Sequence, residues 1–121
     1  MSKILIVEDE DDIAKVLKKR LTENGFEVIA ASDGYEGTKL AHKEKPDLVI
    51  LDLLMPVGGG MSVLKNIRMS GEIMEIPVVV LTGMKNEDYK KQVLAEGVEA
   101  YLEKPYDPDQ LIATINKLLE K

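Results

Sequence analysis

The strongest constraint on the fold is the alternation of short apolar segments, rich in β-branched residues, with amphipathic segments. Strands that alternate with helices along a chain form βαβ units on a parallel sheet. Several of these segments are almost continuously apolar, as expected of strands that helices cover on both faces. We expect five strands, at Lys3–Val7, Glu27–Ala31, Asp47–Leu51, Val78–Leu81 and Glu99–Leu102.

Five helices are expected between and after these strands. In the first, apolar residues recur at helical spacing, and Asn24-Gly25 provides the stop. The later helices are expected at Tyr35–Glu44, at Met61–Met69, at roughly Glu87–Ala95 with Gly97 as the stop signal, and from about Pro108 to the C-terminus. No gap between elements is long enough to be a linker between domains. The 121 residues therefore predict one doubly wound α/β domain.

Composition and charge narrow the classes of function. The chain has no cysteine, which excludes disulfides, thiolate metal sites and cysteine nucleophiles. Its net charge of -6 argues against direct binding to nucleic acid or an anionic membrane, because both need basic patches. No apolar stretch is long enough for a signal peptide or a membrane span. We expect a small, acidic, soluble domain of the cytoplasm.

Reactive side chains stand at the ends of four predicted strands. Glu8 and Asp9 follow the first, Asp52 the third, Thr82 the fourth, and Lys104 lies just beyond the fifth. The carboxyl ends of parallel strands meet at one edge of the sheet, where ligands bind in a crevice. Three carboxylates would repel one another there unless a cation holds them together. Mg²⁺, a hard ion that prefers oxygen ligands, suits such a cluster.

Asp52 is the candidate nucleophile of this cluster. A carboxylate oxygen can attack phosphorus and form an aspartyl-phosphate. Phosphoryl transfer needs mainly positioning, a metal ion and positive charge near the phosphoryl oxygens. Mg²⁺ and Lys104 would supply that charge, and the Thr82 hydroxyl can donate to a phosphoryl oxygen.

Each residue also has an ordinary structural explanation. Capping and the helix dipole suffice for Asp11-Asp12 at the start of the first helix. Lys104-Pro105 is most simply a surface turn, and Thr82 an ordinary strand exit. Capping explains Asp52 poorly, because the loop Met55–Gly60 separates it from the next helix. The joint placement at strand ends favours a site over these separate explanations.

Other polar residues are assigned no role in the site. His42, the only histidine, is interpreted as solvated in the second helix. Lys90-Lys91 is interpreted as part of a solvated helix face, with some chance of partner contacts.

With these motifs the chain resembles the receiver domains of two-component response regulators, over essentially its whole length. The resemblance rests on Ile4–Asp9, Asp47–Asp52 followed by Met55-Pro56, Pro77–Thr82, and Tyr101–Pro105. It implies a flavodoxin-like, doubly wound five-stranded parallel sheet in the order 2-1-3-4-5, with five helices. It also implies that residues 1–121 form one receiver domain and that the Lys104-Pro105 peptide is cis.

The resemblance further implies roles at the metal site. Asp52 is the phosphoacceptor by this match, and Glu8 and Asp9 are the acidic pair that organises Mg²⁺, with Mn²⁺ as an alternative ion. The backbone carbonyl of Leu54 completes the protein ligands.

The same match implies roles around the phosphoryl group. Thr82 and Lys104 bind it, and Tyr101 occupies an aromatic switch position, turning inward when Thr82 moves toward the phosphoryl group. Leu54 and Met84 flank the path of the attacking water. Both side chains are apolar and cannot orient a water molecule, so we expect a long-lived aspartyl-phosphate.

The implied function is a phospho-accepting signalling switch. A histidine kinase or phosphotransfer protein would donate the phosphoryl group to Asp52. The surface of the fourth helix, fifth strand and fifth helix would then change and bind a partner or output domain. Catalysis would be limited to the chain's own phosphorylation and slow self-dephosphorylation, so it would not be an enzyme in the usual sense.

One loop departs from the family pattern. Gly59 stands where Asp or Asn usually precedes the final glycine of the loop after the phosphoacceptor. The triplet Gly58–Gly60 predicts a looser loop, because each glycine costs conformational entropy on ordering.

Three other functions fit the sequence less well. A haloacid-dehalogenase-like phosphatase needs a second carboxylate two residues after Asp52, where Leu54 stands. A nucleotide-binding flavodoxin-like module needs glycines and amides in the first loop, where Glu8 and Asp9 would repel phosphate. A scaffold that has lost phosphorylation is dismissed only by a phosphorylation assay.

Overall fold

The structure is a computed structural model that describes residues 1–55 and 59–120. Along the chain the elements are β1 (Lys3–Val7), α1 (Asp11–Glu23), β2 (Glu27–Ala31), α2 (Gly34–Glu44), β3 (Leu48–Leu51), α3 (Gly60–Met69), β4 (Val78–Thr82), α4 (Glu87–Glu96), β5 (Ala100–Glu103) and α5 (Pro108–Leu119). The predicted strands and helices are confirmed, and wherever both ends of an element were predicted, the boundaries differ by at most one residue. In the predicted loop 55–60, residues 56–58 lie outside the described part.

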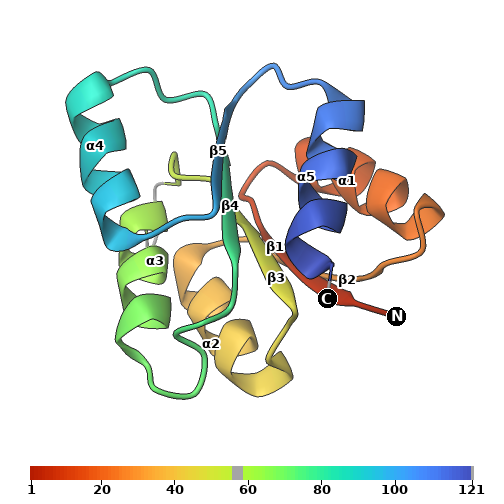
Figure 1. The fold of residues 1–121 in the computed structure, drawn as a ribbon, viewed down its shortest axis with the longest axis horizontal. Coiled ribbons are helices and arrows are strands. Elements are labelled where there is room, and N and C mark those ends of the chain that lie inside the picture. The colour runs from red at the N-terminus through yellow and green to blue at the C-terminus, as the bar shows by residue number, and fades with distance from the viewer. Residues whose placement is uncertain (56–58, 121) are drawn as a thin grey trace.

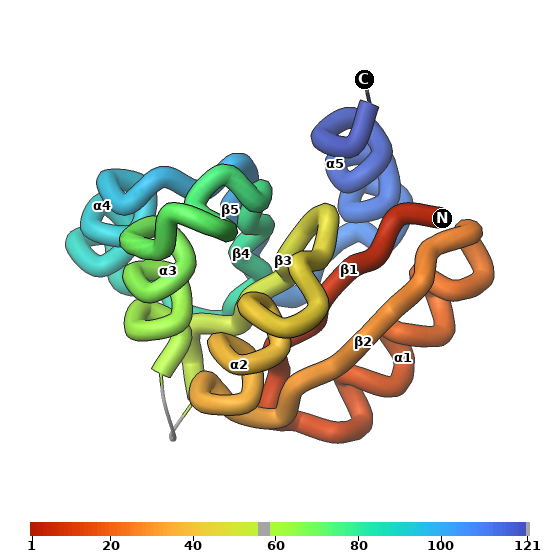
Figure 2. The backbone as a smooth tube through the Cα atoms, turned by 90° about the horizontal axis from the view of Figure 1, so that it is seen from below, coloured from red at the N-terminus to blue at the C-terminus, as the bar shows by residue number. Residues whose placement is uncertain are grey.

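The five strands form one parallel sheet in the order β2-β1-β3-β4-β5. Helices α1 and α5 cover one face, and α2, α3 and α4 cover the other (Figures 1 and 2). This confirms the doubly wound, flavodoxin-like arrangement. The register aligns Val7 with Ala31 and Leu51, so the strands end at a common edge. Across the described residues, none of the helices combines the length and apolar character needed to cross a bilayer.

An apolar core lies on each face of the sheet, because successive strand side chains point to opposite sides. Leu5 and Val7 of β1 belong to the core under α2, α3 and α4, whereas Ile4 and Ile6 belong to the core under α1 and α5. All four side chains are buried. The nearly continuous apolar strands thus reflect burial on both faces, as predicted.

Arg68, near the end of α3, links this helix to the segments that lead into β4 and β5, at the edge of the sheet opposite the strand C-termini. Its Nε donates to the Gly97 carbonyl at 2.8 Å, and its Nη1 donates to the carbonyls of Met74 and Ile76 at 3.0 and 2.7 Å. Its Nη2 bonds Glu99 Oε1 at 2.9 Å. Sequence reasoning did not single out Arg68, because its partners are mainly carbonyls of distant segments.

We expect Arg68→Ala to destabilise the fold by about 2–4 kcal/mol, because several carbonyls lose a charged donor. Urea denaturation measures this free energy of unfolding. The matched control is Lys65→Ala on the same helix, whose ion pair with Glu96 is long (3.8 Å) and exposed. That change is expected to cost at most about 1 kcal/mol. Equal effects of the two substitutions would contradict a special role for Arg68.

Candidate functional site

Backbone hydrogen bonds just beyond the strands position the site. The Glu8 amide donates to the Ala31 carbonyl at 3.0 Å, and the Asp52 amide donates to the Val7 carbonyl at 3.1 Å. The Lys104 amide donates to the carbonyl of Thr82 at 2.8 Å. The ladder therefore continues through these residues, and their side chains start from a rigid edge.

Three carboxylates converge at this edge. One oxygen from each of Glu8, Asp9 and Asp52 lies within 4.8 Å of the others. Glu8 and Asp52 are only 4% and 5% exposed, whereas Asp9 is partly exposed. Like charges held this close, with two of them almost out of water, need compensation by a cation. The predicted acidic cluster therefore exists as a spatial cluster.

Lys104 supplies one positive charge to the cluster. Its Nζ donates to Glu8 Oε1 at 2.7 Å and to Asp52 Oδ2 at 3.3 Å. Burial acts to lower the pKa of Lys104, but the bond to Glu8 and the charges of Asp52 and Glu8 outweigh it, and the pKa is raised. Lys104 is therefore a charged member of the site rather than the surface lysine of the ordinary explanation.

Burial also raises the pKa of Glu8 to about 7, and the neighbouring Asp52 adds to this, while the bond to Lys104 acts to lower it. A carboxyl that titrates near neutrality inside a crevice is typical of a functional site. A second cation beside Glu8 would favour its ionised form.

Both oxygens of Asp52 are held by the protein. The Leu54 amide donates to Oδ1 at 3.0 Å, while Oδ2 accepts from Lys104. The side chain of Leu54 is 49% exposed beside this carboxylate. These bonds fix the orientation of the Asp52 carboxylate at the edge of the sheet.

Thr82 and Met84 stand at the end of the adjacent strand. Thr82 is fully buried, and its Oγ1 accepts a hydrogen bond from the Met84 amide at 3.2 Å. Because a hydroxyl can accept and donate together, its hydrogen stays available for a further acceptor. Among the hydrogen bonds of the described residues, none joins this hydroxyl to Asp52 or Lys104. Met84 is partly buried against the core.

The acidic run that follows β1 has two parts. Glu10 is the N-cap of α1 without a side-chain hydrogen bond, and its amide donates to Glu8 Oε2 at 3.3 Å. Asp11 and Asp12 lie in the first turn, where acidic groups favour the helix dipole. The structural explanation therefore holds for Asp11 and Asp12, through the dipole.

Gly60 has a different role from the one that the glycine triplet suggested. It is the first residue of α3, and a Cβ there would lie 2.5 Å from Leu53 Cα and 2.6 Å from the Asp52 carbonyl oxygen. The position needs glycine because α3 approaches the backbone of the segment that carries Asp52. At Gly59, the N-cap, the nearest described atom to an ideal Cβ is the Met55 carbonyl oxygen, at an ordinary contact distance of 3.8 Å.

Tyr101 lies in β5, paired with Val80, and packs against the core on the α4 side. Lys90 of α4 lies over its ring, with Nζ 5.0 Å from the ring centroid. Lys91 is exposed, as interpreted, whereas Lys90 is partly buried over this ring. His42 is exposed, as predicted. The Lys104-Pro105 peptide is cis, as the resemblance implied.

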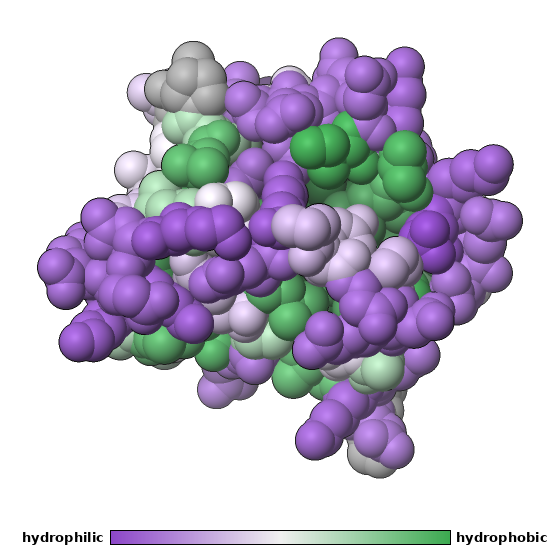
Figure 3. Space-filling model, turned by 90° about the horizontal axis from the view of Figure 1, so that it is seen from above, coloured by the Kyte–Doolittle hydropathy of each residue, from purple (hydrophilic) through white to green (hydrophobic). Residues whose placement is uncertain are grey.

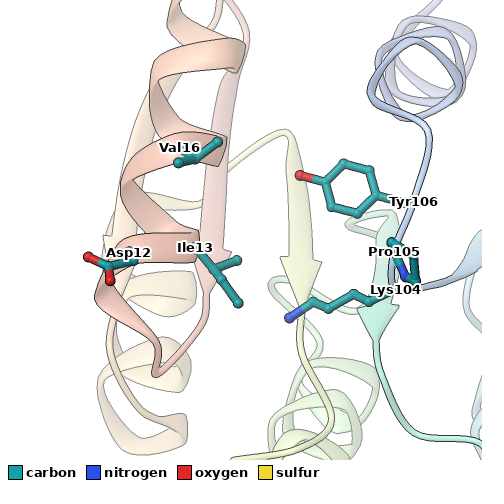
Figure 4. A pocket seen from close by; sticks show the side chains of 6 residues that line it. All are labelled: Asp12, Ile13, Val16, Lys104, Pro105 and Tyr106. Atoms are coloured by element: carbon teal, nitrogen blue, oxygen red, sulfur yellow. The ribbon is translucent and has the colours of Figure 1, made fainter.

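An apolar groove opens next to Lys104. It has a volume of about 390 Å³ and is lined by Asp12, Ile13, Val16, Lys104, Pro105 and Tyr106. Figure 4 shows Ile13 and Val16 on α1 facing the ring of Tyr106 across the groove. Seen from above, this face is mostly hydrophilic, with hydrophobic surface at the upper right, on the side of α1, and again at the upper left (Figure 3). Periodicity did not reveal the groove, because its two walls are distant in sequence.

Comparisons with known proteins agree with this geometry. The family model described as the response regulator receiver domain matches residues 4–116. The chain is 38% identical over 120 residues to the alkaline phosphatase synthesis transcriptional regulatory protein PhoP of Bacillus subtilis, covering 98% of this chain and 49% of PhoP. The chain thus spans about half the length of the first curated relatives that it matches.

Solved structures give the same result. The chemotaxis protein CheY4 of Vibrio cholerae superposes with a TM-score of 0.90 at 32% identity, over 98% of both chains. The receiver domain of the sensor histidine kinase PA1611 of Pseudomonas aeruginosa, with a magnesium ion coordinated in its active site cleft, has a TM-score of 0.90 at 25% identity. That match covers 99% of this chain and 98% of the other. The chain belongs to the response regulator receiver domain family.

Proposed function

We propose that Asp52 accepts a phosphoryl group from a phosphohistidine and that residues 1–121 act as one receiver domain. The observation that carries the proposal is the position of the Asp52 carboxylate, nearly buried between an acidic pair and the Lys104 ammonium. In the transfer, an Asp52 carboxylate oxygen forms a bond to phosphorus as the phosphorus–nitrogen bond breaks. The electron pair returns to the imidazole, which takes up a proton, and the products are aspartyl-phosphate and histidine.

The donor set fits Mg²⁺. Carboxylates of Glu8, Asp9 and Asp52 are hard oxygen ligands, and the Leu54 carbonyl is proposed as a fourth. When bound, the ion supplies positive charge at the phosphoryl oxygens. Mn²⁺ prefers similar ligands and is proposed as an alternative.

Lys104 and Thr82 are proposed to bind the phosphoryl group once it is on Asp52. Lys104 already bonds Asp52 Oδ2, so its ammonium can move to a phosphoryl oxygen over a short path. The Thr82 hydroxyl keeps a hydrogen to donate. Both interactions stabilise charge on the phosphoryl oxygens in a site that is already positioned.

A histidine kinase or histidine phosphotransfer protein is the proposed donor. The apolar groove between Ile13, Val16 and Tyr106 opens beside Lys104 and offers contact area next to the acceptor. Apolar surface beside a charged centre allows a partner to dock without burying an unpaired charge. Apart from its own phosphorylation and slow dephosphorylation, the domain is proposed to catalyse nothing.

The output is proposed to run through the surface of α4, β5 and α5 to an effector or output domain. Relatives about twice as long include transcriptional regulators, among them a DNA-binding one of Synechocystis. The net charge argued against direct binding of nucleic acid. These relatives give that argument no support for a longer protein, so we limit it to the surface of these 121 residues. We also propose a cytoplasmic location and no direct membrane contact.

The test of the proposal is intact mass after incubation with acetyl phosphate. We expect wild type to gain one phosphoryl group in the presence of Mg²⁺ and none with a chelator. Asp52→Asn should gain none, whereas Asp88→Asn, an exposed residue of α4, should behave as wild type. Equal loading of Asp52→Asn and wild type would reject the assignment of Asp52. No loading of wild type would favour a phosphorylation-independent scaffold.

The apolar residues beside the site predict a slow loss of the phosphoryl group. Leu54→Asn places an amide where it can orient the attacking water, and we expect it to shorten the aspartyl-phosphate half-life by about tenfold. The half-life is measured by the decay of the phosphorylated mass after removal of the donor. Leu94→Asn is the matched control, because Leu94 on α4 is 47% exposed against 49% for Leu54. An unchanged half-life in Leu54→Asn would count against the hypothesis that apolar side chains beside the site slow the loss of the phosphoryl group. The same hypothesis applies to the Met84 side chain.

A further inference from the structure

The buried hydroxyl of Tyr101 has an unusual environment. The side chain packs against the core that includes Val80 and Val93, and its hydroxyl oxygen is buried. Within residues 1–55 and 59–120, this oxygen has no hydrogen-bond partner. A buried hydroxyl without a partner has lost its bonds to water, which opposes burial. Packing of the ring against the core, together with any contact to the ring face, must offset this cost.

Lys90 provides such an interaction. Its Nζ lies 5.0 Å from the centroid of the Tyr101 ring, within the range at which a cation is attracted to a ring face. In the described part of the chain, none of the ion pairs involves Lys90. Burial, with smaller contributions from Glu103 and Glu87, raises the pKa of the Tyr101 phenol, so the ring is neutral near pH 7.

From this arrangement we infer that Lys90 is a positioning residue, which holds the Tyr101 ring in its buried place by a cation–π contact and thereby sets the resting balance of the switch. The two interactions at this ring oppose each other, since the unpaired hydroxyl disfavours the position that Lys90 favours. Where a ring exchanges between two positions, a change in either interaction shifts their populations.

The contact is connected to the phosphoacceptor site through the start of α4. Thr82 Oγ1 accepts a hydrogen bond from the Met84 amide, and the chain from Met84 leads directly into the helix that carries Lys90. A Thr82 hydroxyl drawn toward a phosphoryl group would weaken that bond and move this segment. This link to signalling rests on the proposed function, whereas the contact between Lys90 and Tyr101 does not.

Fluorine NMR of the full chain labelled with 3-fluorotyrosine tests the inference without a phosphodonor. The chain has four tyrosines, and Tyr101→Phe assigns the resonance of interest. A soluble gadolinium agent broadens the resonance in proportion to the exposure of the ring. We expect Lys90→Met to lower the ratio of buried to exposed ring roughly two- to fivefold, with a matching increase in broadening.

Two variants separate the cation from other properties of the helix. Lys90→Arg keeps the positive charge and should keep the wild-type broadening, while Lys91→Met makes the same charge change at the exposed neighbour and should also leave it unchanged. Met and Arg are good helix formers, so α4 should persist. If Lys90→Met does not fold, Lys90→Gln replaces it in the same comparison.

Equal broadening in wild type and Lys90→Met, or in Lys90→Met and Lys90→Arg, would overturn the inference. Loading by acetyl phosphate is measured on the same samples as a separate result. If wild type gains no phosphoryl group, the proposed function is rejected and the fluorine result still stands. If wild type gains a phosphoryl group but the broadening of the Tyr101 resonance does not depend on residue 90, only the role of Lys90 is rejected.

Discussion

Asp9→Asn is expected to weaken Mg²⁺ binding by roughly tenfold or more and to reduce phosphoryl loading in proportion when Mg²⁺ is limiting. Asp9 contributes one of the three clustered carboxylates but makes no side-chain hydrogen bond or ion pair among the described residues. Its neutralisation therefore removes a ligand charge without breaking a contact that the fold uses. Substitutions of Glu8 or Asp52 are harder to interpret, because each would also break a hydrogen bond with Lys104.

Calorimetric titration with Mg²⁺ measures the affinity, and intact mass at a low and a saturating Mg²⁺ concentration measures loading. Asp11→Asn is the matched control, because Asp11 is exposed in the first turn of α1 and lies outside the cluster. It makes the same change in net charge two residues away. If both variants weakened binding equally, the effect would be long-range electrostatics, and Asp9 would not be a ligand.

Gly60→Ala is expected to destabilise the fold by about 2–3 kcal/mol and to impair phosphoryl loading as well. The added Cβ would lie 2.5 Å from Leu53 Cα and 2.6 Å from the Asp52 carbonyl oxygen. Both neighbours are backbone atoms, which cannot rotate away as a side chain can. Either α3 shifts outward or the backbone at Asp52 moves, and the second response displaces the Asp52 carboxylate from Lys104.

Urea denaturation gives the free energy of unfolding, and intact mass gives the loading in the absence of urea, where the variant is folded. Gly71→Ala is the control, because an ideal Cβ at Gly71 has no neighbour within 4 Å among the described residues. It should be neutral or slightly stabilising, since alanine restricts the unfolded chain more than glycine does. A Gly60→Ala variant as stable as wild type would show that the backbone at Asp52-Leu53, or helix α3, moves aside without a measurable cost in stability.

The sheet and the polar cluster were predictable because both follow from local patterns. Continuous apolar runs identified β1, β3 and β4, and the parallel topology brought Glu8, Asp52 and Thr82 to one edge without any knowledge of distances. The acidic pair and the lysine before Pro105 were visible as residue types at strand ends. What the sequence showed was therefore which groups meet at the edge.

Contacts between distant segments were not predictable in the same way. Lys90 and Lys91 are identical in type and adjacent, and only the packing of α4 on β5 places one over Tyr101 and the other in solvent. Arg68 bonds carbonyls, which every residue carries, so its partners leave no signal in the sequence. Gly60 looked like a flexible loop residue because steric closeness to Asp52 is a property of the folded chain.

The identity of the phosphorylated residue tests the central claim most directly. Wild-type protein loaded with acetyl phosphate and Mg²⁺ is reduced with borohydride, which converts an aspartyl-phosphate to homoserine, and its peptides are sequenced by mass spectrometry. We predict homoserine at position 52 and at no other aspartate, and none when Mg²⁺ is chelated. Homoserine at a different aspartate, or a phosphoryl group that resists borohydride on a hydroxyl side chain, would contradict the account.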